Sequence, residues 1–194
     1  MIQADPRRKP YLWQRGLSLY YAQRYKDGAE QFAADVAVNP NDTEEQIWHL
    51  LCLAQLMEGG LEAARPMQLK VGRDRRPVCY YYYHCQCHCS CSSLNIAIFF
   101  GLQVMRAVQS LFLSGENETE VVELAERGDI GSQFYAKLYL SLYYESLGNA
   151  GQAGKWMSQA IATDYAKSIG AKDPMVDLAK MAVGKRGWSS LVMK

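Results

Sequence analysis

Apolar residues recur every three or four positions along the first part of the chain, which is the spacing of one face of an α-helix. Between residues 10 and 35 this pattern is interrupted once, near residues 24–28. It therefore predicts two consecutive helices, each with one apolar face. The faces carry Leu12, Gly16, Leu19 and Tyr20 in the first helix and Ala29, Phe32, Ala33 and Val36 in the second.

The same periodicity continues to the end of the chain, with turn residues between the segments. The second helix is expected to end at the Asn-Pro-Asn-Asp run of residues 39–42, because proline cannot continue a helix. Thr43 is then expected to be the N-cap of a third helix, followed by Glu44 and Glu45 in its first turn, and this helix runs to Leu56. Further helices are expected over residues 61–71, 104–113, 118–126, 132–147, 152–163 and 174–183. No segment shows sustained alternation with a period of two, so the predicted fold class is all-α, built from antiparallel helical hairpins.

Residues 12–40 resemble a tetratricopeptide repeat, a helix–turn–helix unit of about 34 residues. The matching positions are Gly16, Leu19, Gly28, Phe32 and Pro40. The unit departs from the repeat pattern at Arg15, where leucine is usual, and at Asp35, where alanine is usual. Residues 137–165 are similar to a second unit without its closing proline, and residues 46–72 fit loosely. The second unit matches at Ser141, Tyr144, Gly148, Ala153 and Ala160.

The resemblance implies that the hairpins stack as a short right-handed solenoid, similar to those of tetratricopeptide repeats. The length of 194 residues predicts a single domain over residues 1–194. Small residues allow close helix packing, so Gly16 is expected to meet Phe32 or its neighbours, and a larger side chain at Gly28 would push the two helices of the pair apart. In such repeats the first helices line a concave groove. Candidate partner-binding residues in this groove are Trp13, Tyr20, Tyr21 and Trp48. Packing in the core is the alternative role for these aromatic side chains.

Charge and composition narrow the range of partners. The chain has 21 Lys and Arg residues against 20 Asp and Glu residues, a net charge of +1, which argues against nucleic acid or a membrane surface as a partner. The first ten residues lack the apolar core of a secretory peptide. The expected location is intracellular, in the cytoplasm, or in a plastid if an upstream N-terminal exon is missing.

The segment of residues 79–103 differs in composition from the rest of the chain. It holds five of the six cysteines, two of the three histidines and four consecutive tyrosines. Cysteines alternate at Cys85, Cys87, Cys89 and Cys91, a spacing that suits soft metals such as Cu(I) better than a closed zinc site. A metal or thiol site at these four residues is therefore one interpretation.

Two other interpretations explain the same segment. It could be an insertion loop, structured or disordered, although long loops without secondary structure are uncommon in compact domains. It could also be a translated intron over residues 78–103, because its residues are those of pyrimidine-rich codons, Val78-Cys79 is compatible with GTATGT and Gln103 with CAG. Excision would join Pro77 to Val104 directly before a predicted helix. The intron is the favoured hypothesis.

No dinucleotide-binding, zinc-protease, serine-hydrolase or EF-hand motif occurs in the chain. Together with the repeat-like hairpins, this predicts a non-catalytic adaptor without a cofactor, which binds a protein or peptide in its concave groove. The alternative is a cysteine-rich metal-binding or thiol-redox protein that acts through residues 79–91.

Overall fold

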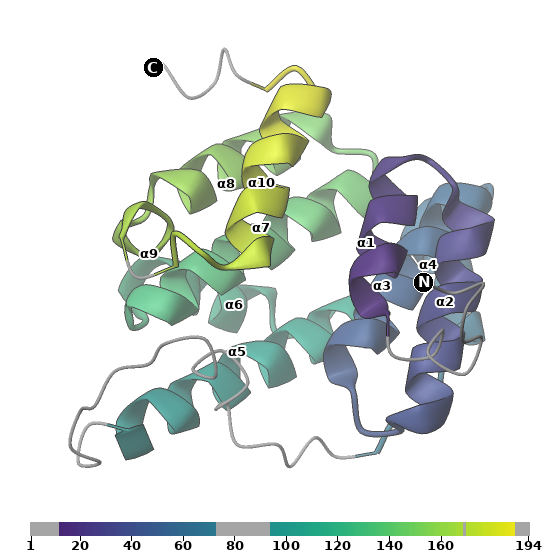
Figure 1. Ribbon diagram of the computed structural model, residues 1–194, viewed down its shortest axis with the longest axis horizontal. Coiled ribbons are helices and arrows are strands. Elements are labelled where there is room, and N and C mark those ends of the chain that lie inside the picture. The colour runs from purple at the N-terminus through teal and green to yellow at the C-terminus, as the bar shows by residue number, and fades with distance from the viewer. Residues whose placement is uncertain (1–11, 73–93, 169, 189–194) are drawn as a thin grey trace. The chain divides into compact units, whose positions relative to one another are not determined.

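The computed structural model describes residues 12–72, 94–168 and 170–188, and of residues 94–103 it describes the backbone. The described residues form ten α-helices and one short 3-10 turn, with no strand among them (Figure 1). The prediction of an all-α chain is confirmed.

The chain divides into two compact units. Among the described residues, unit 1 comprises residues 12–72, 112–116 and 146–148, and unit 2 comprises the rest. Each unit is described by itself below. A single domain over residues 1–194 stays a prediction.

Unit 1 is built around three consecutive helices, α1, α2 and α3, of which α2 packs against both neighbours. A short fourth helix and a 3-10 turn follow them. The bounds are α1 Trp13–Tyr21, α2 Tyr25–Val38, α3 Thr43–Leu56, α4 Gly60–Ala64 and the turn Arg65–Met67. The expected helix over residues 61–71 is therefore shorter than predicted, because Pro66 lacks the N–H that an α-helix needs at this point and the last turn tightens to 3-10.

The contact between α1 and α2 depends on a missing side chain. A Cβ atom at Gly16 would lie 2.5 Å from Cζ of Phe32, so the phenyl ring occupies the space that any larger residue would need. This confirms that Gly16 meets Phe32. The expectation for Gly28 is corrected, since a Cβ atom there would lie 2.9 Å from Sγ of Cys52 on α3 and 3.7 Å from the nearest atoms of α1. Gly28 therefore permits the close approach of α2 to α3 more than that of α1 to α2.

The start of α3 also differs from the prediction by one residue. Asp42, not Thr43, is the N-cap, and its side chain accepts hydrogen bonds from the backbone N–H groups of Glu44 and Glu45 at 3.1 and 3.3 Å. Aspartate and threonine are both favoured at an N-cap, so residue type alone does not decide between Asp42 and Thr43.

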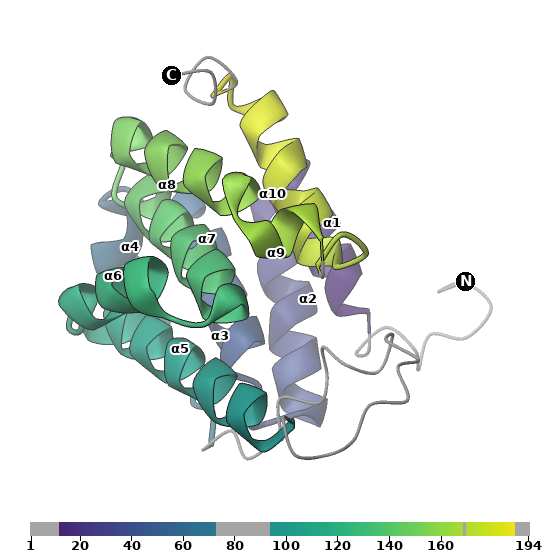
Figure 2. The same ribbon diagram turned by 90° about the vertical axis from the view of Figure 1, so that its left-hand side faces the viewer.

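Unit 2 contains the later helices, in which α6, α7 and α8 lie next to one another in chain order (Figure 2). Its elements are α5 Leu94–Ser114, α6 Glu118–Arg127, α7 Ile130–Ser146, α8 Ala150–Ala162, α9 Asp164–Lys167 and α10 Pro174–Lys185, the last residues of α5 and α7 belonging to unit 1. The hydroxyl of Ser141 on α7 donates to the carbonyl of Ala153 on α8 at 2.7 Å, which ties these two helices together in the core.

Helix α5 begins ten residues earlier than the predicted start at Val104, at Leu94. Residues 94–103 contain no proline, and the helix runs through their single glycine, Gly101, without interruption. Part of the segment with foreign composition is therefore helical, and whether residues 78–103 are a translated intron stays a hypothesis about the gene.

Candidate functional site

Three of the four predicted groove residues lie together in an aromatic cluster. Tyr20, Tyr21 and Trp48 are 0, 3 and 1% exposed, and the ring centroids of Tyr20 and Trp48 are 5.4 Å apart in an edge-to-face arrangement. Phe32 stacks on Trp48 at 6.2 Å. Side chains as buried as these stabilise unit 1 through packing and have no surface to offer a partner. The prediction of a binding role for them is untested, and their burial favours the core alternative.

Trp13 does not join this cluster. It is the first residue of α1 and is half-buried. Of the four candidates, it alone keeps a substantial exposed surface for a partner.

The cysteines of the predicted metal or thiol site, Cys85, Cys87, Cys89 and Cys91, lie outside the described residues. Within residues 12–72, 94–168 and 170–188, no three His, Cys, Asp or Glu side chains cluster so that they could hold a metal ion. Cys52 is a free, buried thiol on α3, and burial raises its pKa to about 12. At neutral pH it is therefore a packing residue, because the reactive species of a cysteine is the thiolate.

Sequence reasoning missed a buried polar cluster between α1 and α2. The guanidinium of Arg15 donates to the side-chain oxygen of Gln31 at 2.7 Å, and the Gln31 amide donates to Oδ1 of Asp35 at 3.0 Å. Gln31 and Asp35 are 0 and 1% exposed. Burial raises the pKa of the Asp35 carboxyl to about 6. The signal was present in the sequence, since Asp35 stands where the repeat pattern has alanine.

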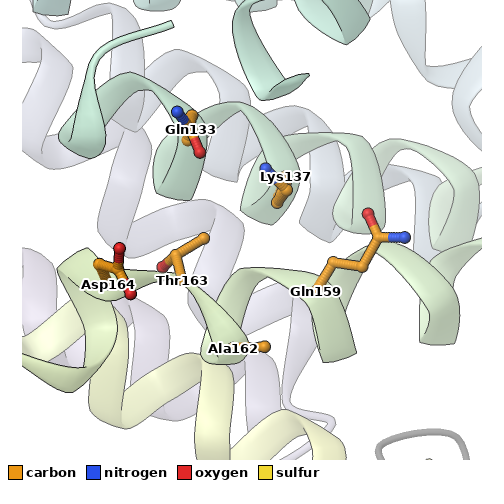
Figure 3. Close-up of a pocket in the computed structure, with 6 residues that line it drawn as sticks. All are labelled: Gln133, Lys137, Gln159, Ala162, Thr163 and Asp164. Carbon is orange, nitrogen blue, oxygen red and sulfur yellow. The ribbon is translucent and has the colours of Figure 1, made fainter. Parts of the chain in front are cut away.

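A hollow open to solvent lies on unit 2, where α7 meets α8 and α9 (Figure 3). Its volume is about 330 Å³, and five of its six lining residues are polar or charged. Gln133 and Lys137 contribute to it from α7, and α8 and α9 contribute the other side. The lining residues are Gln133, Lys137, Gln159, Ala162, Thr163 and Asp164.

Two of these side chains are held in place by the end of α6. Lys137 donates from Nζ to the carbonyl of Ala125, and the Gln133 amide donates to the carbonyl of Gly128 at 2.8 Å. The last carbonyl groups of a helix have no partner within the helix, so both side chains cap α6. Burial lowers the pKa of Lys137, and the charge of Glu126 partly offsets this.

The opposite side of the hollow combines a fixed and an exposed side chain. The Thr163 hydroxyl donates to the carbonyl of Ala160 at 2.7 Å and accepts from the backbone of Ala166 at 3.3 Å, which caps the start of α9. Gln159 is exposed on α8 (Figure 3). A carboxamide both donates and accepts hydrogen bonds, so Gln159 can pair with a peptide group of a bound chain.

No family model, no curated protein and no solved structure matches this chain. Within the described residues, no helix is long and apolar enough to cross a membrane. The class that the fold defines is an all-helical protein of packed helices with an open polar hollow on unit 2.

Proposed function

We propose that the chain is a non-catalytic helical adaptor that binds a protein or peptide. The proposal includes the stacking of its hairpins as a short solenoid of tetratricopeptide type, which the repeat-like residues of α1 and α2 support. The observation that carries the proposal is the hollow between α7 and α8–α9, because it offers polar side chains from adjacent helices to a partner.

The chemistry of the hollow fits an extended segment of a partner chain. Gln133 and Gln159 face it from two helices, and carboxamides suit the alternating donors and acceptors of a peptide backbone. Capping of α6 holds Gln133 and Lys137 in position, so little side-chain entropy is lost when a partner binds. The groove predicted around Tyr20, Tyr21 and Trp48 is replaced in this proposal, because those rings are buried.

The experiment begins with selection of binders from a random displayed peptide library on the immobilised full chain. Calorimetry then measures the Kd of the best peptide for the wild type and for Gln159→Arg, which fills the hollow with a longer charged side chain. We expect the variant to bind about tenfold more weakly, a loss of about 1.4 kcal/mol.

Gln152→Arg is the matched control, because Gln152 is an exposed glutamine two turns earlier on α8 and does not line the hollow. It should leave the Kd within about twofold of wild type. An equal Kd for wild type and Gln159→Arg, or a library that yields no binder, would overturn the proposal.

A further inference from the structure

The buried polar cluster of Arg15, Gln31 and Asp35 is unusual for the contact between two helices. The opposing charges of Arg15 and Asp35 do not meet directly, because the Gln31 carboxamide lies between them and bonds to both. The positive charge therefore reaches the carboxylate only through a neutral amide. This compensates a buried negative charge less well than direct contact would.

The second oxygen of the Asp35 carboxyl group lacks the kind of hydrogen bond that Oδ1 accepts from Gln31. Oδ2 of Asp35 is buried and makes no hydrogen bond of ordinary length and angle with the described residues. An ionised carboxylate accepts hydrogen bonds at both oxygens, so its buried charge is only half satisfied here. A neutral carboxyl group loses much less when it is buried.

The charged and polar groups around Asp35 lie in or next to α1, in α2 and at the start of α3. Arg15 on α1 and the backbone of Leu12 favour the ionised form, and Gln31 on α2 favours it through its hydrogen bond. Asp42, the N-cap of α3, favours the neutral form through its negative charge. Burial is the largest effect and also favours the neutral form.

We infer that Arg15, Gln31 and Asp35 form a proton-operated clamp between α1 and α2, which holds the two helices more firmly when the Asp35 carboxyl is neutral. Asp35 takes one proton from solvent in mildly acidic medium and releases it as the medium becomes neutral. Loss of the proton leaves a buried negative charge against α1. The α1–α2 hairpin is therefore less stable in neutral medium than in mildly acidic medium.

The direction in which stability changes with pH follows from the pKa of Asp35 in the folded and in the unfolded chain. The folded pKa is about 6 and the usual value is 3.8, so the folded chain binds the proton more tightly than the unfolded chain. The stabilisation is complete below the unfolded value and is lost as the pH rises through the folded value. Between pH 5 and pH 7.5 the folding equilibrium constant should fall about tenfold through this group.

The test is the urea unfolding of the full chain at several pH values between 5 and 7.5, for the wild type and for Asp35→Asn. The variant keeps the shape and removes the charge, so its stability relative to wild type should rise with pH across this range. Asp27→Asn is the control, because Asp27 is an exposed acid on the same helix whose partner is Arg24 at 2.6 Å. This control should keep the pH dependence of the wild type.

The clamp is overturned if stability depends on pH in the same way in wild type and in Asp35→Asn. It is also overturned if Asp27→Asn loses this pH dependence as fully as Asp35→Asn does. If Asp35→Asn does not fold, the wild-type protein still decides the matter by NMR titration of the Asp35 carboxyl carbon. A midpoint near pH 6 supports the clamp and one near pH 4 contradicts it. Hydrogen exchange at α1 amides, corrected for the intrinsic rate, should rise over the same range.

Discussion

At the scale of single residues, two unlike features set the contact of α1 with α2. One is Gly16, whose missing side chain admits the ring of Phe32, and the other is the buried Asp35 beneath Arg15 and Gln31. The sequence predicted the first because glycine at that position matches a known repeat. It did not predict the burial of Asp35, because an aspartate on a helix is usually solvated. Only the folded structure shows that neighbouring residues cover this side chain and leave Asp35 1% exposed.

Gly16→Ala should destabilise the chain by about 1–3 kcal/mol, since the added methyl group overlaps the Phe32 ring and the helices must separate. Chemical denaturation followed by circular dichroism measures this. The matched control is Gly184→Ala, because Gly184 also lies in a helix, α10, and a Cβ atom there meets no atom within 4 Å. The control should be neutral or stabilising by up to about 1 kcal/mol. Equal losses in both variants would show that the α1–α2 contact is not tight at Gly16.

At the scale of elements, periodicity located the helices well and their ends less well. The α-helical segments expected over residues 118–126 and 174–183 are confirmed as α6 and α10, with ends that differ by one or two residues. Asp173 is the N-cap of α10, and its side chain also accepts hydrogen bonds from the hydroxyls of Tyr135 and Tyr165. Helix ends depend on caps and tertiary contacts that periodicity does not contain, which is why α4 and α5 differ most from their predicted bounds.

The correction at the start of α3 gives a prediction of its own. Asp42→Ala should cost about 1 kcal/mol of stability, because two backbone N–H groups at the first turn lose their acceptor. Thr43→Val removes only a hydroxyl at a position that does not cap and should cost less. Thermal unfolding of both variants compares them. If Thr43→Val proves the more damaging, threonine is the cap and the prediction made from the sequence was right.

At the scale of the whole molecule, the all-helical class was predictable and the candidate site was not. Charge and motif content predicted neither the hollow nor its residues, because Gln133, Lys137 and Gln159 become neighbours only when α7 packs against α6 and α8. The aromatic residues that looked like a binding surface became the core of unit 1, since large rings bury more apolar area than any other side chain. Periodicity identifies which residues face other helices, and it does not separate a groove from a core.

The most direct test of partner binding at the hollow is an NMR titration of the isotope-labelled full chain with the tightest peptide from the display selection. The expected result is that amide shifts change most at Gln133, Lys137 and residues 159–164, with little change at α1 and α3. If the largest changes instead fall on α1 and α3, around Trp13 and Trp48, the hollow is not the binding site and the aromatic groove predicted from the sequence takes its place.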